Sequence, residues 1–169
     1  MSKFLNDHAS IGLTVEAKGP FGRFCFHEDK HHDIVLLAAG SGITPMMAML
    51  RYIDDLCLQT TISLIYCVRT RSDIIFEGEL EQLRSRLKKR RYRVVLSQPD
   101  EEWSGAKGHI NQQIIQDSVD DLTIADFSLC GPGPFMDASR SALTALAVHP
   151  ERIMQESFSG AARKSAGGA

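Results

Sequence analysis

The chain of 169 residues suits one compact domain, and its 43% hydrophobic and 24% charged residues are ordinary for a globular protein. A net charge of −2 gives the molecule as a whole no electrostatic basis for binding nucleic acid. No apolar run reaches the roughly 18 residues that suggest a membrane span, and the first ten residues lack an apolar signal region. We therefore expect a cytoplasmic protein that binds neither nucleic acid nor membrane.

The first 28 residues contain strand-like pieces. Leu13–Lys18 alternates apolar and polar residues, Gly19–Gly22 predicts a turn, and Phe24 and Phe26 continue with a period of two. Two strands alone are marginal in water, so these pieces would need a larger body to pack on. The sequence predicts a short β remnant over residues 1–28.

Strands and helices then alternate, beginning with the continuous apolar run Ile34–Ala39, which is typical of a strand buried on both faces. We expect further strands over 61–68, 92–97, 127–130 and 152–156, and helices over about 45–56, 77–88, 110–119 and 134–148. This pattern predicts an α/β fold, a five-stranded parallel sheet of order 3-2-1-4-5 with helices on both faces. The main domain would span residues 29–158, and the Gly/Ala/Ser-rich residues 159–169 a flexible tail or linker.

The segment Gly40–Pro45 directly follows the first buried strand. Its glycines would let the backbone approach a pyrophosphate, Thr44 could cap the next helix, and Pro45 suits the first helical position. Free N–H groups and the helix dipole would then face the anion. A turn that needs glycine for its shape alone is the alternative. An ordinary Rossmann dehydrogenase is disfavoured, because Pro45 replaces the third glycine and Tyr66–Arg69 contains no acid to bind a ribose.

The segment Cys130–Met136 repeats this design, with a buried strand, a Gly/Pro turn and a helix opened by a proline. Strands one and four are neighbours in the predicted order, so both loops would flank the crevice where ligands bind. The cysteines at 25, 57, 67 and 130 form no Cys-x-x-Cys pair, and His27, His31 and His32 lie in a polar loop. We therefore predict no metal site.

The segments Ala38–Pro45 and Leu129–Met136 resemble the paired signatures of the ferredoxin–NADP reductase superfamily, and Gln155–Phe158 resembles its terminal strand. The chain is most similar to reductase components of bacterial oxygenase and demethylase systems, over about residues 2–158. Ser2–Asp7 resembles the helix of the FAD-binding barrel that contacts the flavin phosphates, and Gly19–Phe24 its closing hairpin. The family's Arg-x-Tyr-Ser flavin motif does not occur in this sequence, so we expect the isolated chain to bind FAD poorly.

The resemblance implies a role for each site residue. Around the pyrophosphate and the adenosine ribose it places Gly40, Gly42, Ile43, Thr44, Pro45, Arg69 and Thr70. Near the nicotinamide it places Cys130, Glu156, Phe158, Gly131, Pro132, Phe135 and Met136, and at the flavin phosphates Ser2. Read without the resemblance, Cys130 is a buried strand cysteine, Glu156 a surface acid and Phe158 a core or stacking aromatic.

The implied activity is hydride transfer from NADH or NADPH to FAD, followed by electron transfer to a ferredoxin-type iron–sulfur protein or an oxygenase component. Arg69 and Arg71 could pair with a 2′-phosphate and favour NADPH, whereas the resemblance favours NADH. The alternatives are a nucleotide-binding module without redox chemistry, or a truncated fragment that lacks flavin. Exposed edges of the β remnant could also pair between copies of the chain into a homo-oligomer.

Overall fold

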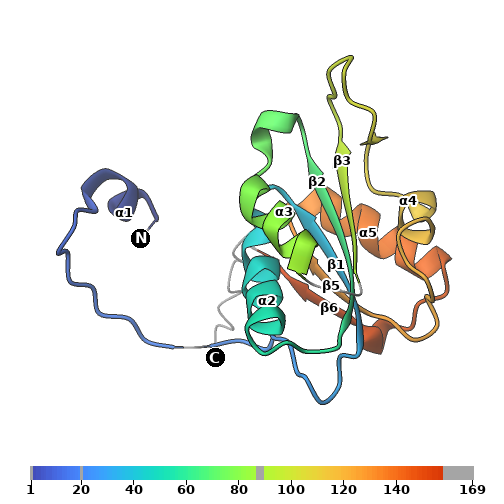
Figure 1. Cartoon of the computed structure of the whole chain (residues 1–169), viewed down its shortest axis with the longest axis horizontal. Helices are drawn as coiled ribbons and strands as arrows, with labels where there is room; N and C mark the ends of the chain where they lie inside the picture. The colour runs from blue at the N-terminus through green and yellow to red at the C-terminus, as the bar shows by residue number, and fades with distance from the viewer. Residues whose placement is uncertain (1, 20, 87–89, 158–169) are drawn as a thin grey trace, which may run out of the picture.

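The computed structural model describes residues 2–19, 21–86 and 90–157 (Figure 1). All neighbouring strands of its six-stranded sheet run parallel, in the order β4-β3-β2-β1-β5-β6. The strands are β1 (Asp33–Ala39), β2 (Thr61–Val68), β3 (Arg90–Leu96), β4 (Ala106–Lys107), β5 (Asp126–Cys130) and β6 (Ile153–Glu156). The helices are α1 (Ser2–His8), α2 (Ile43–Asp55), α3 (Glu77–Arg86), α4 (Gln112–Gln116) and α5 (Gly133–Ala145), with short 3₁₀ turns η1 (Gly40–Gly42), η2 (Arg71–Asp73) and η3 (Pro150–Arg152).

Each face of the sheet has its own apolar core. Along β1, Ile34 and Leu36 face the core formed with α2 and α3, whereas Val35 and Leu37 face the core formed with α4 and α5. This two-sided burial explains why β1 is a continuous apolar run rather than an alternating pattern. Each fully buried aliphatic side chain contributes about 1.5–3 kcal/mol, so the two cores fix the sheet firmly.

The predicted sheet order is confirmed, because the expected order 3-2-1-4-5 corresponds to β3-β2-β1-β5-β6. The additional strand, β4, lies between the strand expected over 92–97 and the helix expected over about 110–119, and it pairs Ala106 and Lys107 with the end of β3. Its turn is held by the Trp103 indole, whose Nε1 donates to the Ala106 carbonyl at 2.9 Å. A two-residue strand has no periodicity, so sequence patterning could not show it.

Two helices are shorter than expected. Helix α4 starts after Asn111, whose side chain accepts the Ile114 N–H at 2.9 Å, and it ends at Gln116. Helix α5 ends at Ala145, and Ala147 has a positive φ of 58°, which stops the helical path before Val148. Within the described ranges, no helix combines the length and apolarity that crossing a bilayer requires.

The strands expected within residues 1–28 are wrong, whereas the assignment of this segment to a remnant of an FAD-binding barrel stays a prediction. Residues 2–8 form α1, but residues 9–19 and 21–32 contain no strand. The segment before β1 extends away from the sheet (Figure 1), and its side chains at Ile11, Val15 and Phe21 are exposed. A strand needs a neighbour to satisfy its backbone hydrogen bonds, and the sheet offers this segment none. The domain boundaries placed at residues 28 and 158 stay predictions.

Candidate functional site

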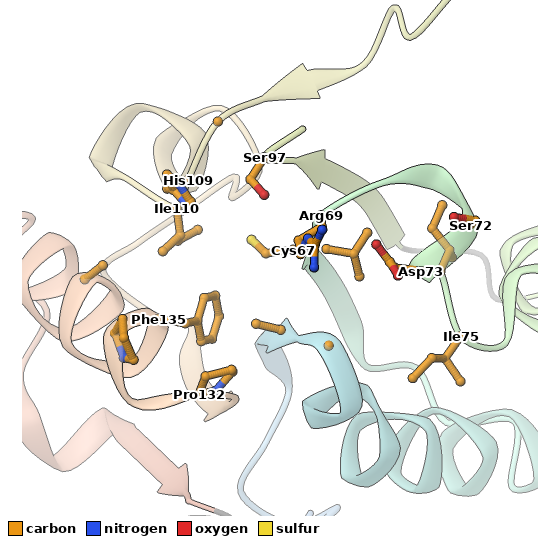
Figure 2. A pocket seen from close by; sticks show the side chains of 17 residues that line it. Cys67, Arg69, Ser72, Asp73, Ile75, Ser97, His109, Ile110, Pro132 and Phe135 are labelled. Atoms are coloured by element: carbon orange, nitrogen blue, oxygen red, sulfur yellow. The ribbon is translucent and has the colours of Figure 1, made fainter. Parts of the chain in front are cut away.

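A pocket of about 860 Å³ lies at the edge of the sheet where the parallel strands end (Figure 2). Its walls come from the ends of β1 and β2, from the loops after β2, β3 and β4, and from the first turns of α5. The lining residues are Ala39, Gly40, Cys67, Val68, Arg69, Ser72, Asp73, Ile74, Ile75, Ser97, Gly108, His109, Ile110, Pro132, Pro134, Phe135 and Ala138. Four of the predicted site residues therefore line it, namely Gly40, Arg69, Pro132 and Phe135.

The two glycine loops touch each other beside this pocket. A Cβ on Gly42 would lie 2.1 Å from the carbonyl oxygen of Cys130 and 2.9 Å from the backbone nitrogen of Gly131. The contact follows from the sheet, because Ala38 in β1 pairs in register with Cys130 in β5. The predicted proximity of the loops is confirmed, and it places the pocket at the point where the strand order reverses.

The first loop differs in detail from the expectation for Thr44 and Pro45. Strand β1 passes through Gly40, with a φ of +53°, into the turn η1, and α2 starts at Ile43 with Gly42 as its N-cap. Thr44 is therefore no cap; its Oγ1 donates to the Ser41 carbonyl at 2.9 Å. Pro45 occupies the third helical position instead of the first. Its missing N–H costs nothing there, because the N–H groups of the first turn have no partner within the helix. Ile43 is fully buried in the core.

The second loop opens α5 onto the pocket. Pro132 is extended, with φ −63° and ψ 156°, and α5 begins at Gly133. Gly131 is needed for space, since a Cβ there would lie 2.6 Å from a ring carbon of Phe135 and 3.0 Å from the Ala39 Cβ. Phe135 lines the pocket, whereas Met136 is buried in the core and does not line it.

The loop between β2 and α3 supplies charged and polar groups to the pocket (Figure 2). Arg69 is exposed, and its Nη2 lies 3.5 Å from Oε1 of Gln98. Thr70 does not line the pocket, but its N–H and hydroxyl both donate to Oδ2 of Asp73, at 2.9 and 2.7 Å. These two bonds, helped by the charge of Arg69, lower the pKa of Asp73 and keep its carboxylate ionised.

Asp73 was missed by the sequence analysis, which looked for an acid only within Tyr66–Arg69. The carboxylate comes from η2, five residues beyond the end of β2. A signal for it was present, because Thr70-x-x-Asp73 has the spacing of a capping box. Among the other unpredicted lining residues, Cys67 is the second-last residue of β2, and Ser97 and His109 follow the ends of β3 and β4. They carry no motif, and only the sheet brings them together.

Cys130 and Glu156 lie at neighbouring positions but not in the lining of the pocket. Cys130 ends β5, is fully buried, and pairs in register with Glu156 at the end of β6. Burial, and secondly the Glu156 carboxylate, raise the pKa of the Cys130 thiol to about 11, so it keeps its proton at neutral pH. This fits a packing surface and not a nucleophile. Burial likewise raises the pKa of Cys67 to about 12.

Ser2, predicted to lie at the flavin phosphates, is not brought to the pocket. Ser2 begins α1, which lies apart from the sheet in Figure 1. Phe158 lies outside the described residues. The roles expected for both at a flavin stay predictions. Within residues 2–19, 21–86 and 90–157, no group of three or more His, Cys, Asp or Glu side chains is placed to hold a metal ion.

Comparisons with known proteins agree with this geometry. The family model "Oxidoreductase NAD-binding domain" matches residues 36–141, more than half of the chain. The stachydrine N-demethylase reductase subunit Stc4 of Rhizobium meliloti is 33% identical over 93% of this chain and 45% of the relative. The glycine betaine monooxygenase reductase subunit of Chromohalobacter salexigens is 29% identical over 94% of this chain and 44% of the relative. The chain thus spans less than half the length of these relatives.

Solved structures show the same relationship. The flavohem-like FAD/NAD-binding domain of nitric oxide dioxygenase from Vibrio cholerae superposes with a TM-score of 0.81 at 26% identity, covering 93% of this chain and 63% of that one. The CS-b5R domains of human Ncb5or, in an NAD⁺ form, give a TM-score of 0.70 at 30% identity, covering 80% of this chain and 40% of that one. The chain therefore belongs to the oxidoreductase NAD-binding domain family, in the ferredoxin–NADP reductase superfamily.

Proposed function

We propose that the chain binds NADH in the pocket at the ends of its strands and orients the nicotinamide for hydride transfer to FAD in a flavin-dependent reductase. The observation that carries this proposal is the direct contact between the Gly42 and Cys130–Gly131 backbones at the reversal of strand order. The names of the relatives support the rest of the pathway. They are reductase subunits and electron-transfer components of monooxygenases and dioxygenases, so the electrons would pass on to a ferredoxin-type or oxygenase iron–sulfur partner.

The pyrophosphate would lie against the first glycine loop at Gly40, on the pocket side of the contact between the two loops. Gly40 lines the pocket, and there is open space where a Cβ on this residue would be, so an anion can approach its backbone. Helices α2 and α5, of 13 residues each, both begin at these loops. Their N-terminal ends carry partial positive charge, which stabilises a bound phosphate by roughly 0.3–1 kcal/mol per helix at an exposed site.

The adenosine ribose would lie beside Arg69 and Asp73, and this pair supports NADH over NADPH. The Asp73 carboxylate is ionised and lines the pocket, so it can accept a hydrogen bond from a free 2′-hydroxyl. A 2′-phosphate in the same place would be repelled. The opposite charge of Arg69 offsets part of this repulsion, and we therefore expect a preference for NADH and not an absolute exclusion of NADPH.

The nicotinamide would approach the junction of β5 and β6. The protonated Cys130 thiol offers a small, polarizable surface there, and Glu156 is its register partner. Orientation is what the protein contributes, because hydride transfer requires the nicotinamide ring close to the acceptor. FAD, when bound, would accept the hydride and release electrons singly. Helix α1, whose sequence resembles the helix that contacts the flavin phosphates in the family, lies apart from the pocket. We therefore propose that this chain alone binds FAD poorly.

The test is calorimetric titration of the purified chain with NADH, NADPH and AMP. We expect one NADH per chain, with a Kd within the micromolar to millimolar range typical of such substrates. The substitution Asp73→Asn should lower the ratio of NADPH Kd to NADH Kd about fivefold, because it removes the repelling charge while keeping the shape. Asp55→Asn is the matched control, because Asp55 is an exposed carboxylate outside the pocket lining, and both Kd values should stay at the parent level. A chain that binds no NADH would refute the proposal.

The visible spectrum separates the enzyme from the binding module that we keep as the alternative. A yellow protein that reduces ferricyanide with NADH is the reductase itself. A colourless protein that still binds NADH is a nucleotide-binding module, or a part of a reductase that needs its flavin domain from elsewhere. The cytoplasmic location stays a prediction that the comparisons leave untested.

The exposed apolar side chains before residue 22 favour a partner for that segment. Ile11, Val15 and Phe21 are exposed, and so is about half of Phe4. Solvent exposure of this much apolar surface on an extended segment is unusual for a protein working alone. We propose that a flavin-binding domain covers it, and that pairing between copies of the chain is the alternative. Gel filtration distinguishes the two, because a monomer excludes a stable homo-oligomer.

A further inference from the structure

Tyr66 is a fully buried residue of β2 that does not line the pocket, yet it contacts two of its walls. Its hydroxyl donates to the Gly40 carbonyl at 3.1 Å. The same oxygen accepts the backbone N–H of Ile75 at 3.4 Å. One phenol thereby joins the first glycine loop to the loop between β2 and α3.

Both residues held by Tyr66 belong to the pocket. Gly40 precedes β2 in the chain and Ile75 follows it, and both line the pocket. Among the hydrogen bonds of the described residues, none joins these two residues directly. Burial raises the pKa of the Tyr66 hydroxyl, so it keeps the proton that it donates to Gly40. A buried hydroxyl bonded on both sides fixes its partners more strictly than a flexible surface contact does.

The far end of the same loop is held independently. Phe76 has a φ of +63°, and the Arg51 guanidinium lies 5.3 Å from the centre of its ring. Arg51 is in turn bound by both carboxylate oxygens of Glu79, at 2.7 and 2.8 Å. The loop that carries Asp73 is therefore fixed to helix α2 through Phe76 and Arg51. Among the hydrogen bonds of the described residues, those of Tyr66 join this loop to the first glycine loop.

We infer that Tyr66 is a positioning residue for the dinucleotide, and that its hydroxyl sets the spacing between the wall that holds the pyrophosphate and the wall that holds the adenosine ribose. This inference rests on the proposed function for the identity of the ligand. The hydroxyl itself touches neither part of the nucleotide. It acts through Gly40 on one side and through Ile75, two residues from Asp73, on the other.

The test replaces only the hydroxyl, with Tyr66→Phe. We expect the Kd for NADH to rise about tenfold, which corresponds to about 1.4 kcal/mol. We also expect the amide of Ile75 to exchange with solvent about tenfold faster in the nucleotide-free protein, since it loses its acceptor. Tyr92→Phe is the matched control, because Tyr92 packs on the same face of the sheet but lies outside the pocket lining. Its Kd for NADH should stay within about twofold of the parent value.

The outcomes separate this inference from the proposed function. If the parent chain binds no NADH, the proposed function fails, whereas the exchange rate at Ile75 still reports on the bond to Tyr66. If the parent binds NADH and Tyr66→Phe binds it equally well, Tyr66 has no positioning role, whatever happens at Ile75. A Kd that rises equally in Tyr66→Phe and Tyr92→Phe also overturns the inference, because the effect is then general destabilisation.

A second measurement covers the case in which Tyr66→Phe does not fold. The chain has three tyrosines, so 3-fluorotyrosine labelling gives three fluorine resonances. Tyr52→Phe and Tyr92→Phe assign two of them, and the third belongs to Tyr66. We expect NADH to shift the Tyr66 resonance and to leave that of Tyr92 in place. A Tyr66 resonance that NADH does not move contradicts the inference.

Discussion

The two glycine loops perform similar tasks in the fold but require glycine for different neighbours. A side chain on Gly42 would collide with backbone, the Cys130 carbonyl at 2.1 Å. A side chain on Gly131 would collide mainly with the ring of Phe135, at 2.6 Å. The Cys130 backbone is held in the parallel ladder between β1 and β6, whereas the half-buried Phe135 ring can rotate. Glycine is therefore required at position 42 by the packing of the sheet, and at position 131 by the space that the Phe135 ring takes up beside the pocket.

The strongest test of this difference is Gly42→Ala. We expect it to lower the free energy of unfolding by about 3 kcal/mol or more and to abolish NADH binding. The new Cβ would collide with the Cys130 carbonyl, which the pairing of β5 with β1 and β6 holds in place. Urea denaturation and calorimetry measure the two effects. Gly78→Ala is the control, since Gly78 lies in α3 with open space where its Cβ would be, and alanine favours a helix. Parental stability in Gly42→Ala would disprove the close contact.

Gly131→Ala should have a smaller effect, on binding more than on folding. We expect a loss of about 1 kcal/mol in stability and a Kd for NADH about fivefold higher, because the displaced Phe135 ring would move into the pocket. The double substitution Gly131→Ala with Phe135→Leu should recover part of the affinity, as a double-mutant cycle would measure. Additive effects of the two substitutions would show that the ring is not what Gly131 accommodates.

The sheet could be predicted from the sequence because its signals are local and strong. Ile34–Ala39 and Thr61–Val68 are buried on both faces, and each is followed by a helix whose apolar residues face the sheet. The expected strands before residue 33 fail for the opposite reason. Alternation in Leu13–Lys18 shows only that one face could be buried, and within the described residues nothing lies beside it to form a ladder.

Reasoning from the residues alone could predict the candidate site only where a backbone constraint marks it, whereas Arg69 and Phe135 were predicted through the family resemblance. Gly40, Gly42 and Gly131 lie at a turn or at a close approach of two backbones. Such positions require glycine, so the residue type itself marks them in the sequence. Asp73 and His109 reach the pocket from loops, and their residue types are common on any surface. Thr44 shows a further limit, because its pattern fits a helix cap, whereas the turn η1 lets the helix start at Ile43, two residues earlier than expected. End positions of elements depend on such local turns.

Cys130, the last residue of β5, gives the smallest predicted effect on binding. We expect Cys130→Ala to leave the Kd for NADH within about threefold, because the thiol only packs. The effect of the Cys130 thiol should instead appear in how the free energy of unfolding depends on pH. The thiol ionises near pH 9 in the unfolded chain but near 11 in the fold, so the unfolded state loses its proton first and stability falls as pH rises from 9 to about 11. Urea midpoints should fall less steeply over this range in Cys130→Ala than in the parent chain, although Cys67 keeps part of the slope in both. An equal slope in the two proteins, or rapid alkylation of Cys130 at pH 7.5, would mean that its thiol is not held protonated inside the fold.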